Sequence, residues 1–467
     1  MILGHKGLIT GVMKYSIWTI GCQMNSSDSL RVAAALEAWG CEHTEDIRQA
    51  DIVVLNTCVV RQSAEDRASG FLWSLKPLKE RRPSLIIALM GCMVGIRGNG
   101  QLRERYPHVD VFMPPGEVQP LISYLETVLL PGEERCGSGG DPYTLPSYAR
   151  GQLVSAPVPV VLGCNHVCSY CVIPARRGRE RSRPLTTVVS EVETLAQNGV
   201  REVVLLGQIV DRYGYDLGSD APRLPDLLAA VSAVAGIVRV RFLTSHPSYF
   251  DEPLIEAVRT LPKVCEHIEV PIQAGDDEIL RRMRRGYTVD DYRRLIERIR
   301  KQLPECSIAT DVIVGFPGET EQQFQHTLDL LAELQMDVCH VAMYSPRPGT
   351  LAAATMPDDV PPGEKKRRLD AVNALQEEIA ARINRRLLGQ RVEILVEGKQ
   401  KGKWKGRTRT NKLVFFCDNS GRDWRGALVD VVVTWTGPWS MQAELATVRE
   451  NEHYGERLPR DTSGLTS

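Results

Sequence analysis

Three cysteines lie within eight residues of one another in the segment GCNHVCSYC, residues 163–171. Cys164, Cys168 and Cys171 provide three thiols, and the segment has no fourth cysteine. A closed zinc site takes four ligands, and so does an iron–sulfur cluster held only by thiolates. The set therefore predicts a metal centre with one coordination position left open. His166 would complete a zinc site, but it is two residues from Cys164 and would crowd the same loop.

A second set of three cysteines is spread over the first hundred residues. Each follows a short apolar run: WTIGC ends at Cys22, VLNTC at Cys58 and ALMGC at Cys92. The carboxyl ends of parallel strands lie along one edge of a sheet, so these three thiols are expected to converge. One cysteine at a strand end is more often a packing residue, but three at the same position predict a second metal site.

Composition limits the class of protein that carries these sites. The chain has 467 residues, 43% apolar and 25% charged, with a net charge of -1. This balance is typical of a folded multidomain protein and excludes one that is basic over its whole surface. No long apolar segment and no secretory signal are evident, so we expect a cytoplasmic protein with no membrane contact. Twelve cysteines in that reducing compartment favour metal binding over disulfides.

The pattern of apolar runs predicts an α/β protein of three regions. Residues 12–126 alternate strands and helices as a parallel-sheet domain, and 127–153 form a Gly- and Pro-rich linker. Residues 154–388 contain six strand–helix repeats, which predict a partial (β/α)6 barrel with its chemistry at the carboxyl ends of the strands, followed by a charged exit helix from about 363. Residues 389–449 predict a small antiparallel β-barrel, and 450–467 a disordered tail.

Several motifs together resemble the radical S-adenosylmethionine (SAM) superfamily, and within it the methylthiotransferase family, closest to its MiaB type. Over residues 14–446 they are, in order, TIGCQMNSSDS, LNTCVVRQSAEDR, ALMGCM, LGCNHVCSYCVIPARRGRERSRP, LLGQ, LTSHP, DVIVGFPGET, YSPRPGT and GRTRTNKLVFF. The resemblance implies that each cysteine set holds a [4Fe-4S] cluster. SAM would chelate the open iron at Cys164, Cys168 and Cys171, and the other cluster would carry the sulfur to be transferred. Two SAM molecules would be used per turnover, and the C-terminal barrel would be an RNA-binding TRAM domain.

The resemblance also implies a group of SAM-contacting residues at other strand ends. These are Gly207, Gln208, Ser245, Gln273, Asp311, Gly315, Pro317 and Gly318. The two residues after LLGQ are Ile209 and Val210, where family members often have an asparagine, so hydrogen bonding is not expected there. His246 is as readily a structural histidine as a functional one. The other cysteines, Cys41, Cys136, Cys265, Cys306, Cys339 and Cys417, have no ligand spacing.

Two basic stretches are expected to meet an RNA substrate. ARRGRERSRP follows the cysteine loop and contains Arg177 and Arg179. GKQKGKWKGRTRTNK has a basic residue at every second position, which an extended chain would place on one face with Trp404 available for stacking. From it we predict phosphate contacts by Lys401, Lys403, Arg407 and Arg409.

The resulting hypothesis is a tRNA methylthiotransferase that adds a 2-methylthio group to an N6-prenylated adenosine 3′ of the anticodon. It would need an electron donor and a sulfur source, and we expect a monomer. One alternative within the class is modification of threonylcarbamoyladenosine or of a ribosomal-protein aspartate; the segment GCQMN favours the prenylated base. An alternative of another class is a noncatalytic iron–sulfur RNA-binding protein that senses redox state, which would form no 5′-deoxyadenosine on reduction.

Overall fold

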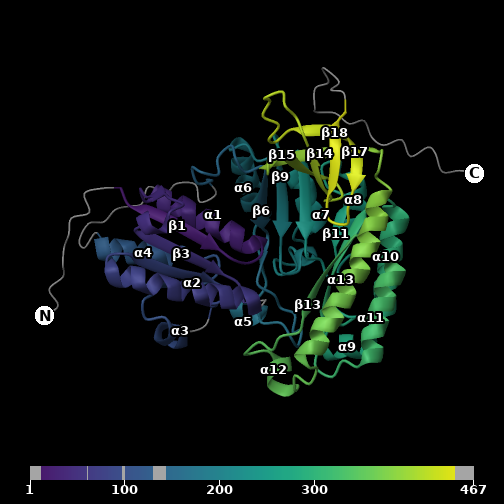
Figure 1. The fold of residues 1–467 in the computed structure, drawn as a ribbon, viewed down its shortest axis with the longest axis horizontal. Helices are drawn as coiled ribbons and strands as arrows, with labels where there is room; N and C mark the ends of the chain where they lie inside the picture. The colour runs from purple at the N-terminus through teal and green to yellow at the C-terminus, as the bar shows by residue number, and fades with distance from the viewer. Residues whose placement is uncertain (1–11, 60–61, 97–99, 130–143, 447–467) are drawn as a thin grey trace, which may run out of the picture.

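The computed structural model describes residues 12–59, 62–96, 100–129 and 144–446. Its N-terminal part, purple and blue in Figure 1, lies beside a central parallel barrel, and a small β-barrel, yellow, covers one end of that central barrel. Most of the expected linker and all of the expected tail 450–467 lie outside the described residues, as does Cys136.

The N-terminal part is the predicted parallel sheet with helices on both faces. Its strands lie in the order β2-β1-β3-β4-β5, and every neighbouring pair is parallel. The strands are β1 Lys14–Thr19, β2 Glu42–His43, β3 Ile52–Thr57, β4 Ile86–Gly91 and β5 Val111–Met113; the helices are α1 Gln23–Ala38, η1 Ile47–Gln49, α2 Gln62–Arg81, α3 Gly100–Arg105 and α4 Gln119–Leu129.

The two faces of this sheet have separate hydrophobic cores. Every residue of β3 and β4 is buried, which explains why their sequences read as continuous apolar runs. One face packs against α1 and α4, and the other against α2. Because β1, β3 and β4 are neighbours and run in the same direction, Cys22, Cys58 and Cys92 follow three adjacent strand ends, as predicted.

The central part is an open barrel of six parallel strands. Two three-stranded sheets, β10-β9-β6 and β11-β12-β13, are joined where Val240 pairs with Val264. The barrel strands are β6 Ser155–Pro159, β9 Glu202–Leu206, β10 Arg239–Leu243, β11 His267–Glu269, β12 Ser307–Val314 and β13 Val338–Met343. The edge strands are β6 and β13, and α1 of the N-terminal part packs against β6. The six predicted repeats are therefore confirmed.

Helices cover the outside of this barrel, and their apolar residues form one large core with its strands. They are α6 Leu185–Gln197, α7 Leu224–Ala233, α8 Glu252–Thr260, α9 Asp277–Arg282, α10 Val289–Gln302, α11 Glu321–Leu334 and α12 Leu351–Thr355; short elements near the first strand are β7 Val161–Leu162, α5 Ile173–Arg177, β8 Arg181–Ser182 and η2 Val210–Arg212. The exit helix α13, Pro362–Arg385, runs along the barrel toward the C-terminal part (Figure 1).

The C-terminal part is a closed five-stranded barrel, in the order β14-β15-β16-β18-β17. Its strands are β14 Arg391–Gln400, β15 Lys403–Thr408, β16 Leu413–Phe416, β17 Leu428–Thr436 and β18 Met441–Leu445. It is antiparallel except for one pair, because β16 runs parallel to β18. The predicted alternation of basic residues along one extended strand is wrong. The chain turns back at Lys401 and Gly402, which have φ values of 50° and 81°, so Lys399 and Lys403 lie on different strands.

Candidate metal and cofactor sites

The Cys164–Cys171 loop lies at the carboxyl ends of the barrel strands. It is attached there by Ser169, whose N–H donates to Met283 O at 3.0 Å and whose hydroxyl donates to Arg282 O at 2.8 Å. Gly163 starts the loop with a φ of 69°, and a Cβ at this position would lie 2.2 Å from Arg179 O. Only glycine permits this approach, which lets Cys164 N donate to Gly178 O at 3.1 Å.

The three thiols of this loop are close enough to influence one another, and their sulfurs accept hydrogen bonds from N–H donors. His166 N donates to Cys164 Sγ at 3.4 Å, and Arg285 Nη1 donates to Cys168 Sγ at 3.3 Å. Burial raises the pKa of Cys171 to about 12 and also raises that of Cys164. Metal binding must therefore displace protons from these thiols. Hydrogen bonds to sulfur are one of the means by which proteins tune iron–sulfur clusters.

The side chain of His166 has a partner other than the cysteines. Its Nε2 lies 3.0 Å from the Tyr249 hydroxyl, and its ring lies 4.6 Å from the ring of His246, centroid to centroid. Burial, followed by the charge of Arg285, lowers the pKa of His246 to about 2, so this histidine is neutral. The backbone N–H of His246 donates to Asp211 Oδ2 at 2.9 Å, which holds this residue in place. These contacts favour a structural role for His166, whereas Nε2 of His246 is buried without a hydrogen-bond partner among the described atoms.

Two buried asparagines determine where the second cysteine set lies. Asn25 Nδ2 donates to Asn56 Oδ1 at 2.7 Å, and Asn56 Nδ2 donates back to Asn25 O at 2.8 Å. The Oδ1 of Asn25 accepts from both the N–H and the thiol of Cys22, each at 3.3 Å. Asn56 is two residues before Cys58 on β3. The pair thus holds the N-terminus of α1 against the end of β3.

The third cysteine of this set is positioned by glycine. Gly91 has a φ of 101°, and a Cβ there would lie 2.4 Å from Thr57 O. The close approach lets Cys92 N donate to Thr57 O at 2.9 Å. Burial raises the pKa of Cys92, and Cys22 acts on it electrostatically. The structure therefore brings Cys22, Cys58 and Cys92 together at one sheet edge, with Cys22 exposed and the other two buried.

Two kinds of metal centre differ in how far apart their thiolates stand. In the part of the chain that the structure describes, no three His, Cys, Asp or Glu side chains are grouped as ligands of a single metal ion. Two thiolates on one zinc ion lie at most about 4.6 Å apart, because each Zn–S bond is about 2.3 Å. In a four-iron cluster each thiolate binds a different iron, so the sulfurs stand further apart. Three thiols with N–H donors on their sulfurs fit such a cluster with one iron left open.

The other residues expected to contact SAM lie at the same end of the barrel. All of them except Asp311, which lies within β12, follow the last residues of strands β9 to β12 and share that edge with the cysteine loop. Gln208 Nε2 donates to Met24 Sδ of α1 at 2.9 Å, and Gln273 has a φ of 75° and pairs with Val312. Ser245 is buried, and its hydroxyl has no hydrogen-bond partner among the described atoms. Ser245 follows β10 at the end of the barrel where the cysteine loop lies.

The glycine-rich stretch after β12 packs against side chains of this chain. Beside Gly315 lies Lys365, and beside Gly318 lies the guanidinium of Arg282. The N–H of Gly315 donates to Glu319 Oε2 at 2.5 Å. Ile209, in place of a polar residue, packs with Cys164 and Ile173. SAM contact by the stretch stays a prediction, since these contacts describe only how the protein folds around it.

Arg177 does not lie where a substrate phosphate would meet it. Its Nη2 forms an ion pair with Asp28 Oδ2 at 3.4 Å, and the two side chains are 5% and 3% exposed. The guanidinium also acts electrostatically on the Cys92 thiol. Arg179, two residues on, is exposed. Sequence reasoning missed the role of Arg177 because Asp28 is 149 residues away.

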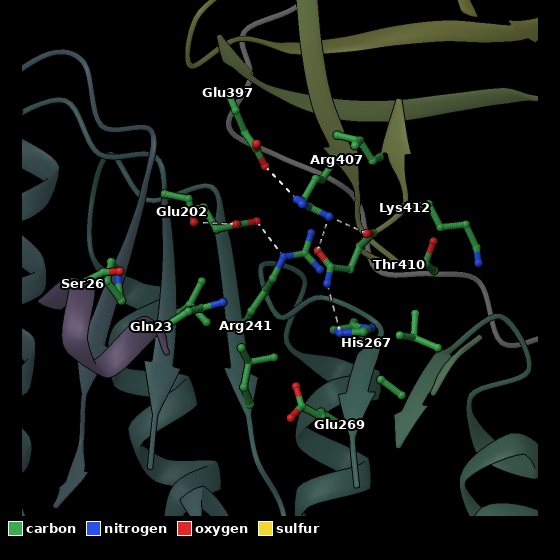
Figure 2. A pocket seen from close by; sticks show the side chains of 18 of the residues that line it. Gln23, Ser26, Glu202, Arg241, His267, Glu269, Glu397, Arg407, Thr410 and Lys412 are labelled. Atoms are coloured by element: carbon green, nitrogen blue, oxygen red, sulfur yellow. Dashed lines mark hydrogen bonds and ion pairs between the residues drawn. The ribbon is translucent and has the colours of Figure 1, made fainter. Parts of the chain in front are cut away.

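A cavity of about 760 Å³ lies at the opposite, amino-terminal end of the barrel. Figure 2 shows its walls: Gln23 and Ser26 from α1, Glu202, Arg241, His267 and Glu269 from barrel strands, and Arg407, Thr410 and Lys412 from the C-terminal part. Burial, and then the charge of Asp311, raises the pKa of Glu269 to about 7. All three parts of the chain therefore border this cavity, with charged and polar side chains set among apolar ones.

The two arginines of GRTRTNK are engaged within the protein. Arg407 Nε pairs with Glu397 Oε1 at 3.1 Å, and Arg409 Nε pairs with Glu266 Oε2 at 2.7 Å, while Arg409 also donates to Pro262 O and Val264 O. Trp404 is 3% exposed and belongs to the barrel core, so its predicted stacking on a base is wrong. Lys401 remains exposed, and Lys403 is half-buried. The exposed aromatics nearby are Trp435 and Trp439, at 50% and 56%.

Comparison with known proteins assigns families to two regions of the chain. Residues 158–331 match the Radical SAM superfamily, and residues 14–114 match the uncharacterized protein family UPF0004. A tRNA-2-methylthio-N(6)-dimethylallyladenosine synthase of Roseiflexus sp. (strain RS-1) is 48% identical over 93% of this chain and 90% of its own length. The protein of that name from Dehalococcoides mccartyi (strain CBDB1) is 45% identical over 94% and 99%.

Solved structures resemble the chain in fold. The radical SAM methyltransferase TsrM from Kitasatospora setae superposes with a TM-score of 0.51 at 16% identity, covering 73% of this chain and 77% of that one. The cobalamin-dependent radical enzyme OxsB gives 0.50 at 14% identity, covering 79% and 56%. No helix among the described residues is both long and apolar enough to cross a membrane.

Proposed function

This chain belongs to the methylthiotransferase family of the radical SAM superfamily, and from that membership we propose that it adds a 2-methylthio group to an N6-prenylated adenosine of tRNA. The observation that carries the proposal is the placement of two three-thiol sets at the boundary of two domains. Cys164, Cys168 and Cys171 lie at the carboxyl ends of the barrel strands. The set at Cys22, Cys58 and Cys92 comes from the adjacent domain. Arg177, at the end of the helix that follows the first set, interacts electrostatically with Cys92.

When bound, the [4Fe-4S] cluster of the barrel supplies the electron that splits SAM into methionine and a 5′-deoxyadenosyl radical, and the auxiliary cluster supplies the sulfur. The chain's own residues hold the two sites in a fixed relation. Across the domain boundary, Arg31 pairs with Glu191 at 3.2 Å and Arg347 with Glu65 at 2.9 Å. A fixed geometry matters because a carbon radical reacts with whatever group is held nearest to it.

The prenylated base is favoured over the two alternative substrates. The relatives at 40–48% identity carry the dimethylallyladenosine name. A threonylcarbamoyl group carries a carboxylate that needs a cation at the barrel mouth. Arg177 is paired with Asp28, and Arg212 is paired with Glu180 at 2.7 Å. Both of these arginines therefore already have anionic partners.

For RNA we propose contacts by Arg179, Lys401 and Lys403, with Trp435 and Trp439 as exposed aromatics on the same small barrel. Arg407, whose side chain is 38% exposed, stays a predicted contact. Arg409 is paired with Glu266 and only 15% exposed, so we no longer expect it to contact phosphate. We further infer an external electron donor, a sulfur source, a cytoplasmic location shared with the tRNA, and a monomer. A tRNA substrate follows from the family; these finer assignments are proposals.

The substrate proposal is tested with anaerobically reconstituted enzyme, SAM, reductant and sulfide. We expect prenylated tRNA to be converted to its 2-methylthio form at least about ten times faster than threonylcarbamoylated tRNA, equivalent to about 1.4 kcal/mol. Equal rates would contradict the prenyl preference and leave the chemistry intact. Absence of 5′-deoxyadenosine on reduction would instead favour the noncatalytic redox sensor.

Triple alanine variants test the two metal sites separately. Replacing Cys164, Cys168 and Cys171 should leave about four of about eight irons and abolish SAM cleavage. Replacing Cys22, Cys58 and Cys92 should also leave about four irons, but should spare SAM cleavage while eliminating sulfur insertion. Full iron in the first variant, or methylthiolated product from the second, would show that the ligands are assigned wrongly.

A further inference from the structure

Arg177 forms a buried link between the two domains that carry the cysteines. It ends α5, six residues after Cys171, and its partner Asp28 lies on α1, whose first residue follows Cys22. Both side chains are almost fully buried, and their nearest N and O atoms are 3.4 Å apart. A buried ion pair is not stabilising by default, because desolvation of both charges offsets their attraction. The pair therefore needs a reason beyond domain packing.

The guanidinium also faces the thiols of the adjacent domain. It acts electrostatically on Cys92 and Cys22 as well as on Asp28. Its neighbour Arg176 directs Nη1 to Met93 O at 3.5 Å, next in the chain to Cys92. One short helix of the barrel thus reaches into the edge of the N-terminal sheet. Arg177 is the cation that acts on the Cys92 thiol.

The negative charge of a cluster at this sheet edge would explain why the cation of Arg177 is buried there. A four-iron cluster in its usual oxidised form, held by three thiolates, bears about one net negative charge. Asp28 adds another, and a sulfur bound to the open iron adds more. Anions in a buried site are costly unless a paired, hydrogen-bonded cation accompanies them. A guanidinium has five N–H donors, so it can serve a sulfur and a carboxylate together.

We propose that Arg177 is a positioning residue of the auxiliary cluster: its guanidinium donates to the Cys92 sulfur and offsets the cluster's negative charge, while Asp28 orients it. The proposal rests on the proposed function, because it presupposes a cluster at Cys22, Cys58 and Cys92. It reassigns Arg177 from the RNA surface to the sulfur-carrying site. Asp28, within the GCQMNSSDS segment, thereby orients the guanidinium of Arg177.

The measurable consequence is a change in the reduction potential of one cluster. Net charge and hydrogen bonds to sulfur set the potential of an iron–sulfur cluster. A nearby cation stabilises the more negative, reduced form. Removing the guanidinium should therefore shift the auxiliary cluster to a more negative potential. A residue that only held the two domains together would not move this potential.

The experiment uses the full chain carrying Cys164→Ala, Cys168→Ala and Cys171→Ala, so that the auxiliary site alone binds iron. This parent should hold about four irons and give one redox transition by EPR-monitored titration. A parent without iron would refute the cluster assignment itself. If the parent binds iron, differences in reduction potential between it and its variants test the role of Arg177 and not the cluster assignment.

Three substitutions are made in this parent. Arg177→Gln should give a more negative potential and a slower return of iron after chelation. Arg177→Lys keeps a charge without the forked geometry and should lie between Arg177→Gln and the parent. Arg181→Gln removes an exposed arginine of β8 and should leave the potential unchanged. An unchanged potential in Arg177→Gln, or equal loss of iron from the Gln and Lys variants, would overturn the proposal.

Discussion

At the residue scale, the Asn25–Asn56 pair decides where two of the cysteines lie. Asn25 is fully buried and fully engaged: its amide nitrogen donates to Asn56 Oδ1 and Thr57 O, and its oxygen accepts from Cys22. Asn56 donates in addition to Ser29 Oγ at 3.0 Å. Buried amides of this kind are costly to leave unpaired, so the pair fixes one geometry.

Replacing Asn56 with alanine should weaken the sheet edge. The change leaves one Asn25 amide donor short of a partner and should cost about 1–3 kcal/mol of local stability. Hydrogen exchange of the β3 and β4 amides measures this loss. Gln49→Ala, at an exposed position of the same domain, should change it by less than about 0.5 kcal/mol. Unaltered exchange in Asn56→Ala would contradict the role assigned to the pair.

The sequence allowed both cysteine sets to be predicted, for different reasons. Cys164, Cys168 and Cys171 lie close together in one loop, and the other three follow parallel strands. Three apolar runs ending in cysteine must present their thiols at one edge. The partners of the arginines could not be predicted in this way. Arg177 pairs with a residue 149 positions away, and Arg409 with Glu266, 143 positions away. A basic run shows that charge is present, but only tertiary packing shows whether an acidic side chain already faces it.

At the scale of elements, the turn between β15 and β16 fastens the C-terminal barrel to the central one. Two buried arginines at the start of β10 donate to its backbone: Arg239 Nη1 to Arg407 O at 2.6 Å, and Arg241 to Thr408 O at 2.7 Å and Arg409 O at 2.6 Å. Arg241 is also paired with the buried Glu202 at 2.9 Å. GRTRTNK therefore acts as a docking segment in this protein.

Replacing Arg241 with methionine should loosen this docking. Glu202 would be left buried without its cationic partner, at a cost of about 3–5 kcal/mol. Arg409 O would lose the donor from Arg241, whereas Thr408 O would keep the N–H of Asn411 at 3.0 Å. Limited proteolysis and hydrogen exchange of residues 407–412 would report the release. The double variant with Glu202→Leu should recover part of the loss.

A surface pair provides the matched control for Arg241. Arg391 and Asp430 pair on the same small barrel with side chains 46% and 44% exposed. Arg391→Gln should therefore cost less than about 1 kcal/mol. If residues 407–412 were equally protected in Arg241→Met and in the parent protein, the docking would depend on other contacts.

At the scale of the whole molecule, the small C-terminal barrel, where we propose that RNA binds, and the cysteine sites occupy opposite ends of the central barrel. The small barrel contacts the first residues of β10, β11 and β12, as in Figure 1, whereas the cysteine loop lies beyond the last ones. The lysines of the β14–β15 turn are free of ion pairs among the described residues, while Arg407 and Arg409 are not.

This difference predicts a contrast in salt dependence. Changing Lys401 and Lys403 to glutamine should weaken tRNA binding and flatten the plot of log K against log salt by about 0.7 to 0.9 per lost phosphate contact. Lys366→Gln on α13, 60% exposed, should alter neither. Arg409→Gln should lower stability and leave the slope unchanged. If Arg409→Gln flattened the plot of log K against log salt, Arg409 would be a phosphate contact after all.

The attachment of the small barrel fixes the distance between the β14–β15 lysines and the two cysteine sets. Barrel strands of five to eight residues span roughly 17–26 Å at about 3.3 Å per residue. An RNA held by the β14–β15 lysines must therefore reach at least that far before its target base meets the two cysteine sets. A stiff stem-loop can bridge this span without a further loss of conformational entropy, whereas a short, flexible oligonucleotide of the same local sequence cannot. Substrates would thus be sorted by the length and stiffness of what surrounds the base as well as by the base itself.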